Sequence, residues 1–190
     1  PYLDISIDKY RINAVHSSIG RIANDECLTF SIRIASQDLK INDKSNFLTP
    51  ELRELFKVLI YSKCSILIGG TTGSGKTEFQ KYLISMMEEN TRVVVIDNVL
   101  ELENIRNDLI DFTSWQVDDK NQNATASLLI KTALRSNPDW LIVAEARGSE
   151  MIDVLNSAMT GLPIISTIHS YDIYNMPARV ISMVMMHDKK

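Results

Sequence analysis

The sequence predicts an α/β fold with a mostly parallel sheet, preceded by part of a small β-rich domain. From about residue 50 onward, short apolar runs alternate with longer stretches of helical periodicity, which is the order of strands and crossover helices in α/β proteins. The run Val93–Ile96 is continuously apolar. Such a strand is buried on both faces, as in a parallel sheet covered by helices. Residues 1–35 instead show the apolar–polar alternation of half-buried strands.

Residues 1–35 are expected to be the C-terminal part of the β-rich domain. Leu3, Ile5 and Ile7 alternate with polar residues, and two further runs supply the remaining strands. Residues 36–48 are mainly polar and lack periodicity, so we interpret them as a linker. The strands of this part are predicted within residues 3–7, 11–15 and 28–34.

Residues 49–190 are expected to form the main domain. The segment Thr49-Pro50-Glu51 is a helix start, because a hydroxyl N-cap precedes a proline at the first helical position and an acid in the first turn. This helix is predicted to end near Tyr61. Strands and helices then alternate: strands are predicted at 65–68, 92–96, 140–144 and 163–167, and helices at 75–89, 124–135, 150–160 and 175–186.

The composition excludes several classes of protein. Of the 190 residues, 45% are hydrophobic, and this share excludes a disordered chain. A formal net charge of −4 leaves no overall basic field, so direct nucleic-acid binding is not expected. Two cysteines, Cys27 and Cys64, exclude a disulfide framework or a cysteine-rich zinc site. No apolar run approaches the roughly 20 residues of a membrane-spanning helix.

The segment Gly70–Thr77 matches the phosphate-loop pattern G-x-x-x-x-G-K-[ST], between an apolar run and a helical pattern. The glycines would let backbone N–H groups turn toward a phosphate chain, and the helix N-terminus adds free donors. Lys76 would reach the β- and γ-phosphates, and the Thr77 hydroxyl would bind Mg²⁺. We therefore predict a nucleoside triphosphate site; a chance match in a glycine-rich turn is the alternative. Its residues are Gly70, Thr71, Thr72, Gly73, Ser74, Gly75, Lys76 and Thr77.

Two acids follow predicted strands, and a site of this kind needs an acid that orients the attacking water. Asp97 follows Val93–Ile96, and Glu145 follows the run that begins at Leu141. Both are expected at the C-terminal edge of the sheet, where open α/β sheets bind ligands. We interpret Glu145 as the acid that activates water and holds Mg²⁺ through water, with Asp97 assisting. The alternative is a turn residue or helix cap, and it applies above all to Asp97.

His169 follows another predicted strand, and its end lies at the same edge. We interpret His169 as a sensor of the γ-phosphate, or alternatively as a structural hydrogen-bonding residue.

The combined pattern resembles the secretion-ATPase superfamily, the ring motors of type II and type IV secretion, pilus assembly and conjugation. Three regions carry the resemblance: Ala133–Asp139 with Ile142–Gly148 for the Walker B region, Thr160-Gly161 with Ser166–Ser170 for the His box, and Ile96–Leu102 for the Asp box. The resemblance implies a RecA-like domain over residues 49–190, truncated at its C-terminus, and favours the type IV secretion or tight-adherence branch. The chain begins without Met, and we expect a fragment of a longer protein.

The resemblance also implies roles for four arginines. Residues 11–15 and 31–34 are similar to the end of the N-terminal domain in those branches, where the matching arginines point at the γ-phosphate. Arg11 and Arg33 are therefore candidate nucleotide-binding residues, and a pair of surface arginines is the alternative. Arg135 and Arg147 fall in the Walker B region and are candidate sensors.

Three positions depart from the family pattern. Asp97-Asn98 stands in place of a Glu-Asp pair, Ala144 in place of a glycine, and Ser17-Ser18 where relatives often carry prolines. Nucleotide binding is expected to tolerate all three changes. The Asp-box change is expected to affect the hydrolysis rate, since a carboxylate set back from a water loses geometry on which catalysis depends.

The resemblance implies a Mg²⁺-dependent ATPase in which hydrolysis drives domain motion about the linker. It further implies a homohexamer that acts with other secretion or pilus components, in the cytoplasm at the inner face of the cytoplasmic membrane. A nucleotide-gated assembly scaffold with weak or no hydrolysis is an alternative that the Asp-box change motivates. A DNA translocase is disfavoured by the acidic balance, and a small-molecule kinase leaves the His box and Arg33 unexplained.

Overall fold

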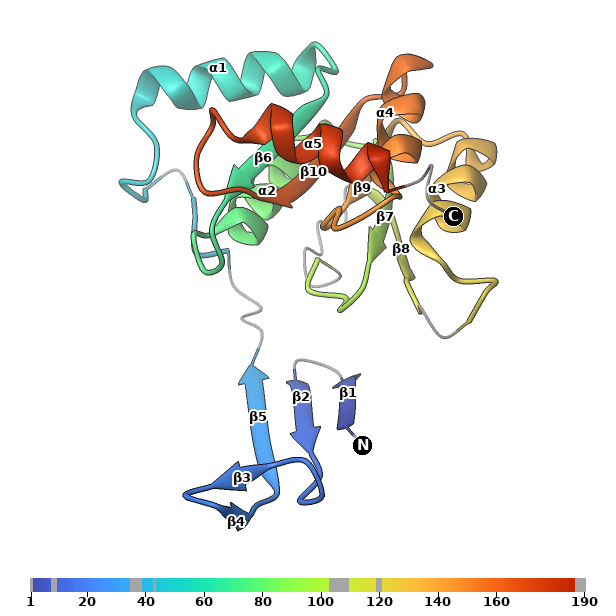
Figure 1. The fold of residues 1–190 in the computed structure, drawn as a ribbon. Coiled ribbons are helices and arrows are strands. Elements are labelled where there is room, and N and C mark those ends of the chain that lie inside the picture. The colour runs from blue at the N-terminus through green and yellow to red at the C-terminus, as the bar shows by residue number, and fades with distance from the viewer. Residues whose placement is uncertain are drawn as a thin grey trace. The chain divides into compact units, whose positions relative to one another are not determined.

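The computed structural model describes residues 2–7, 10–34, 39–42, 44–102, 110–118 and 121–186. The chain divides into two compact units, unit 1 (residues 1–38) and unit 2 (residues 39–190) (Figure 1). The division falls inside the segment predicted to be a linker, of which residues 36–38 and 43 lie outside the described residues. Ile41 is buried, and the Lys40 N–H donates to the Glu78 carboxylate, so the second half of this segment belongs to unit 2.

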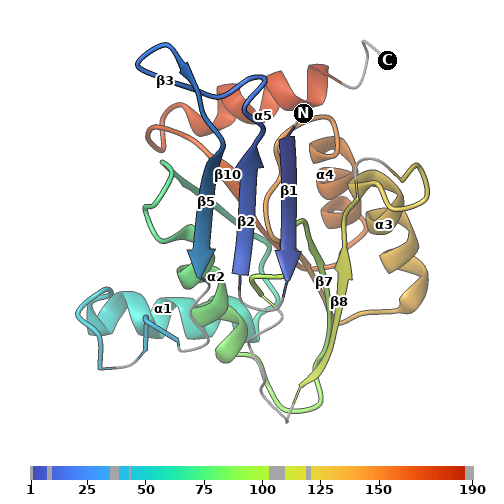
Figure 2. The same ribbon diagram turned by 90° about the horizontal axis from the view of Figure 1, so that it is seen from below.

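Unit 1 contains a three-stranded antiparallel sheet in the order β1-β2-β5 (Figure 2). Its strands are β1 (Tyr2–Ile7), β2 (Tyr10–Val15) and β5 (Thr29–Ile34). A short hairpin of β3 (Arg21–Ile22) and β4 (Asp25–Glu26) lies between β2 and β5 in the chain. Both of its turn residues, Ala23 and Asn24, have positive φ, as a type I′ turn requires. The sequence analysis missed this hairpin because two-residue strands show no alternation.

The sheet of unit 1 has one apolar and one polar face, because directly opposed residues of antiparallel strands share a face. The polar face carries Arg11 opposite Arg33 and Asn13 opposite Ser31. On the apolar face, Leu3, Ile7, Tyr10, Phe30, Ile32 and Ile34 are all exposed. The full apolar face consists of Leu3, Ile5, Ile7, Tyr10, Ile12, Ala14, Phe30, Ile32 and Ile34.

Unit 2 contains a five-stranded parallel sheet in the order β6-β10-β9-β7-β8. Its strands are β6 (Ile66–Gly70), β7 (Arg92–Asp97), β8 (Asp111–Gln116), β9 (Trp140–Val143) and β10 (Ile164–His169). Its helices are α1 (Pro50–Tyr61), α2 (Lys76–Ser85), α3 (Ala126–Ala133), α4 (Met151–Met159) and α5 (Met176–Met185), with a 3₁₀ turn at Leu134–Ser136. The predicted α/β fold with a parallel sheet is confirmed.

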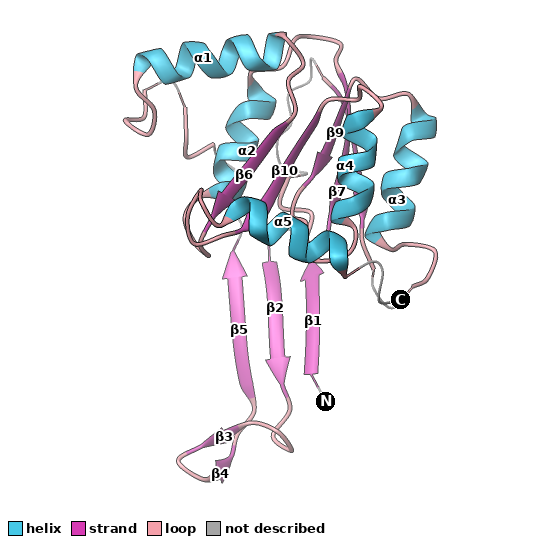
Figure 3. Ribbon diagram, turned by 45° about the horizontal axis from the view of Figure 1, so that its top comes forward, coloured by secondary structure: helices cyan, strands magenta, loops and turns pink. Residues whose placement is uncertain are grey.

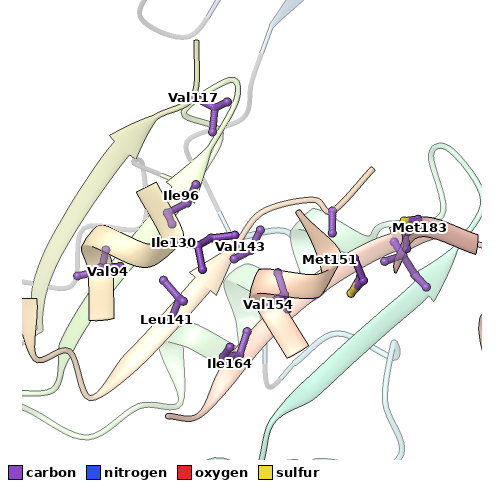
Figure 4. Packing of buried hydrophobic residues seen from close by; sticks show 13 residues of the cluster. Val94, Ile96, Val117, Ile130, Leu141, Val143, Met151, Val154, Ile164 and Met183 are labelled. Carbon is purple, nitrogen blue, oxygen red and sulfur yellow. The ribbon is translucent and has the colours of Figure 1, made fainter. Parts of the chain in front are cut away.

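The core of unit 2 lies on both faces of this sheet (Figure 3). Along β9, Trp140 and Ile142 pack with α1 and α2, whereas Leu141 and Val143 pack with α3, α4 and α5. Figure 4 shows the buried hydrophobic residues that pack between the sheet and helices α3, α4 and α5. All four side chains are almost fully buried, and each such burial stabilises the fold by roughly 1.5–3 kcal/mol. The continuous apolarity of these strands is therefore explained by helices on both sides.

Most predicted helices and strands of unit 2 match the observed elements within a few residues. The strand β8 was not predicted, because Asp111, Thr113 and Ser114 interrupt the apolar pattern of an edge strand that is only half-buried. Helix α2 ends at Ser85 rather than at residue 89, and the chain then turns through Asn90, whose φ is positive.

Candidate nucleotide site

Residues far apart in the sequence meet at the C-terminal edge of the sheet of unit 2. Because all strands are parallel, β6, β10, β9 and β7 end at this same edge in neighbouring positions. The phosphate loop follows β6, His169 ends β10, Glu145 follows β9 and Asp97 ends β7. His169 lies directly opposite Gly70 in the ladder between β10 and β6. The topology thus assembles the residues that the motifs predicted.

The phosphate loop leaves the N-terminus of α2 open. Gly75 is the N-cap of α2 with φ 90°, and Gly73 has φ 77°, a region in which any other residue would be strained. At α1 the Thr49 hydroxyl accepts a hydrogen bond from the first turn, but at α2 no side chain of the described residues does so. The N–H groups of the first turn of α2 are therefore available to an anion such as phosphate.

Lys76 lies in the first turn of α2 and folds back over the loop. Its Nζ donates hydrogen bonds to the carbonyl oxygens of Gly70, at 3.0 Å, and Thr71, at 2.8 Å. Burial lowers the pKa of Lys76, and the nearby Glu145 carboxylate offsets part of that shift. These two carbonyls hold the ammonium where a phosphate chain would be bound. Thr77 follows it in the same turn and is half-buried.

His169 connects the phosphate loop to the predicted catalytic acid. Its Nδ1 lies 3.3 Å from Lys76 Nζ, and its Nε2 lies 2.9 Å from Glu145 Oε1. An ammonium can only donate, so Nδ1 accepts, and this assigns the ring proton to Nε2, on the side of Glu145. The contacts form a chain from Lys76 through His169 to Glu145.

Glu145 keeps hydrogen-bonding capacity in this arrangement. Its side chain is 19% exposed, and Arg147 donates to Oε2 at 2.9 Å. Its Oε1 is buried, and within the described part of the chain no group donates to it in hydrogen-bond geometry, although His169 lies close. A carboxylate oxygen with spare capacity is what orientation of a water molecule requires.

A pocket of about 340 Å³ lies beside Glu145 and Arg147. The predicted sensor Arg147 therefore lines this pocket, and it contacts Glu145. Glu150 closes the turn that follows, since its carboxylate accepts the N–H groups of Arg147 and Gly148. The pocket is lined by Asn98, Val117, Ala126, Glu145, Arg147, Gly148, Ser149, Glu150 and Met186.

Asp97 has a different environment from Glu145. It is buried, and its two carboxylate oxygens accept the N–H groups of Val99, at 3.0 Å, and Leu102, at 3.2 Å. Between them lies Leu100, whose φ of 54° is in the left-handed region. Asp97 thus holds a strained loop in place, which favours the turn-residue alternative for this acid.

The remaining predicted arginines belong to other elements of the chain. Arg135 is exposed in the 3₁₀ turn that leads into the start of β9, and the parallel sheet places strand starts at the opposite edge. Arg11 and Arg33 belong to unit 1, where they oppose each other across β2 and β5. The sheet thus places two positive charges in directly opposed positions on its polar face.

Gln80, which the sequence analysis did not single out, connects α2 to the strands of the site. It is fully buried one turn after Lys76, and its Nε2 donates to the carbonyls of Val143, at 3.2 Å, and Ile165, at 3.4 Å. The sequence signal that could have identified Gln80 is a polar residue on the side of the helix that faces the sheet. The contacts couple the helix that carries Lys76 to β9 and β10.

No group of three or more His, Cys, Asp or Glu side chains suited to a metal occurs in the described ranges. The donors at this edge instead fit a Mg²⁺ ion that is held by one hydroxyl, water and substrate phosphates. Within those same ranges, no helix is both long and apolar enough to cross a membrane.

The chain belongs to the type II/IV secretion system protein family, whose model matches residues 9–189. An uncharacterized protein of Bacillus anthracis is 32% identical over 187 residues, which cover 96% of this chain and 41% of that protein. The chain therefore spans less than half the length of this relative. The predicted membership of the secretion-ATPase superfamily is confirmed.

Two solved structures share the fold. The VirB11 ATPase of the Brucella suis type IV secretion system matches with a TM-score of 0.66 and 23% identity, over 100% of this chain and 64% of that chain. The ATPase DotB of Legionella pneumophila matches with a TM-score of 0.71 and 19% identity, over 96% of this chain and 50% of that chain. These similarities confirm the RecA-like secretion-ATPase fold.

Proposed function

We propose that this chain binds ATP with Mg²⁺ at the C-terminal edge of unit 2 and hydrolyses it as part of a secretion, conjugation or pilus-assembly motor. One observation carries the proposal: a chain of contacts joins Lys76 of the phosphate loop through His169 to Glu145. Its three members follow or end different strands of one sheet. Family membership and the fold supply the context.

ATP binding would begin with an exchange of partners at Lys76. The β- and γ-phosphates would replace the carbonyls of Gly70 and Thr71 as acceptors for Nζ, while the open N-terminus of α2 donates to the same phosphates. A charged acceptor would also favour the protonated ammonium, whose pKa burial now lowers. The Thr77 hydroxyl would be the protein ligand of Mg²⁺, which would supply positive charge to the bound phosphates.

Hydrolysis would depend on Glu145. Its carboxylate would accept a hydrogen bond from a water molecule and orient that water toward the γ-phosphorus. As the new P–O bond forms, the bond to the β–γ bridging oxygen breaks and ADP leaves with the electron pair. The proton of the attacking water passes to the carboxylate and returns to solvent. His169, which contacts both Lys76 and Glu145, would sense whether the γ-phosphate is present.

The resemblance to ring motors extends the proposal to the whole protein. We propose a homohexamer that acts with other secretion or pilus components in the cytoplasm, at the inner face of the cytoplasmic membrane. Arg11 and Arg33 would offset charge on the transferred phosphoryl group, and closure about the linker would be the power stroke. We also propose that Arg135 is a sensor. Because it lies at the opposite edge of the sheet of unit 2, it would act on a site other than the nucleotide site of its own unit.

The test is Mg²⁺-dependent phosphate release from ATP over a series of protein concentrations, with binding of a nonhydrolysable analogue measured separately. We expect turnover that rises steeply with concentration, because a ring completes each site. Lys76→Ala should lose both binding and turnover, whereas Glu145→Gln should bind the analogue and lose turnover by at least a hundredfold. Turnover that survives in Glu145→Gln would contradict the proposed mechanism.

A second function is favoured by the environment of Asp97. Its carboxylate oxygens are already engaged by backbone N–H groups, and the following residue is the uncharged Asn98. The chain would then be a nucleotide-gated assembly scaffold that binds ATP with little hydrolysis. Tight analogue binding without phosphate release at any concentration would support this function and exclude the motor for these 190 residues.

A further inference from the structure

We propose that Thr167 is a positioning residue that holds Glu145 in place for hydrolysis; the inference rests on the proposed ATPase function. Thr167 lies in β10 and is 2% exposed. Its Oγ1 donates a hydrogen bond to the carbonyl oxygen of Ala144 at 2.7 Å. Its own carbonyl oxygen accepts the N–H of Ala146 at 2.9 Å. One residue therefore contacts the backbone on both sides of Glu145.

The segment around Glu145 depends on these contacts because the strand ladder has already ended. The pairing of β9 with β10 stops at Val143, which lies opposite Ser166. Beyond that point, the N–H of Ala144 donates to Ile96 of β7 at 2.9 Å, and the Thr167 hydroxyl takes the carbonyl of the same residue. The hydroxyl thus supplies a hydrogen bond where the sheet itself no longer does.

The residues directly before and after Glu145, Ala144 and Ala146, carry only methyl side chains. The backbone of Glu145 is therefore positioned by the hydrogen bonds of this segment, while Arg147 and His169 contact its carboxylate. Misplacement of a catalytic group by about 1 Å can cost about a hundredfold in rate. Loss of the Thr167 hydroxyl would also leave the carbonyl of Ala144 without its side-chain donor.

Thr167 and His169 contact different parts of the Glu145 segment, the first its backbone and the second its carboxylate. Alternate residues of a strand lie on the same face, so their side chains leave β10 in the same direction. The hydroxyl of Thr167 holds the backbone before Glu145, while the ring of His169 approaches the carboxylate. A shift of β10 caused by the γ-phosphate at His169 would therefore also move the backbone of Glu145.

The experiment compares two substitutions, one that removes the hydroxyl of Thr167 and one that removes its methyl group, in steady-state phosphate release from ATP. Thr167→Val keeps the shape and removes the hydroxyl, whereas Thr167→Ser keeps the hydroxyl. We expect kcat to fall at least tenfold in Thr167→Val, with KM for ATP within about twofold of the wild-type value, and kcat within about threefold of wild type in Thr167→Ser. Thermal unfolding of each protein shows that it is folded at the assay temperature.

Thr132 offers a matched control. Its hydroxyl also donates to a backbone carbonyl, that of Leu128 at 2.8 Å, but within α3 and away from the site. Thr132→Val should leave kcat unchanged. If Thr167→Val is unfolded at the assay temperature, Thr167→Ala and Thr167→Ser form the pair, and a low kcat is expected only in the alanine variant.

Three results would overturn the inference. Wild-type kcat in a folded Thr167→Val protein would show that the hydroxyl has a structural role only. An equal loss of kcat in the serine and valine variants would attribute the effect to packing. Absence of phosphate release from the wild-type protein would refute the proposed function and, with it, this inference; turnover in wild type separates the two failures.

Discussion

The two sheets of this chain treat the same kind of residue in opposite ways. Ile142 on β9 is 0% exposed, whereas Ile32 on β5 is 60% exposed. The parallel sheet of unit 2 is linked by crossover helices, which cover both of its faces. Among the described residues of unit 1 there is no helix, and the apolar face of its antiparallel sheet is exposed. Chain topology, rather than residue type, decides which apolar residues become core.

We expect the two units to differ in function as well. Every contact of the network from Lys76 to Glu145 lies in unit 2, where a well-packed core fixes the strand ends. Unit 1 carries the opposed pair Arg11 and Arg33 on the polar face of a small sheet. Unit 2 should therefore determine nucleotide binding, and unit 1 should act on the rate.

The largest expected difference is in stability. Ile142→Ala should lower the free energy of unfolding by about 2–5 kcal/mol, because it leaves a cavity in a closed core. Ile32→Ala should lower it by less than about 0.5 kcal/mol. Urea unfolding midpoints at unchanged slope measure both values. An equally large cost for Ile32→Ala would show that the apolar face of unit 1 is buried in solution.

A smaller effect is expected from the polar face of unit 1. Arg11→Ala and Arg33→Ala should each lower kcat by about 10- to 100-fold, if the pair offsets charge on the transferred phosphate. Neither change should lower the free energy of unfolding appreciably, because each removes one of two opposed like charges. Ser31→Ala, on the same face, is the control. A similar loss of kcat in this control would argue against a specific role for the arginines.

The smallest effect concerns Asp139, which joins the turn after α1 to the start of β7 in unit 2. The Arg92 N–H, and then Lys63, lower the pKa of Asp139 below its ordinary value of 3.8. The folded state therefore binds the Asp139 proton more weakly than the unfolded state does. The contribution of this carboxylate to the free energy of unfolding is complete above about pH 4 and disappears as pH falls through the lowered pKa. Asp139→Asn should cost less than about 1 kcal/mol at pH 7, since the carboxylate is 44% exposed.

The check on Asp139 is a pair of urea unfolding curves at pH 7 and near pH 2. The difference between wild type and Asp139→Asn should shrink at the lower pH. A difference that stays constant would mean that the charge of Asp139 contributes nothing.

The sequence predicted the parallel sheet of unit 2 and the positions at its edge because continuous apolar runs mark buried strands. It failed at β8, because an edge strand with Asp111 and Thr113 has no such run. Spacing placed Asp97 and Glu145 at equivalent strand ends, but their environments differ through contacts from other segments. The role of Thr167 was also hidden, since its partners lie in a different strand end and their contact depends on the three-dimensional fold.

The most direct test of the account is the side-chain ¹⁵N spectrum of His169 during titration with a nonhydrolysable ATP analogue and Mg²⁺. In the free protein, Nδ1 should show the hydrogen bond that it accepts from Lys76. Analogue binding should shift the Nδ1 resonance as Lys76 turns to the phosphates, and Lys76→Ala should abolish that shift. Saturable analogue binding without any change at His169 would contradict the assembled site.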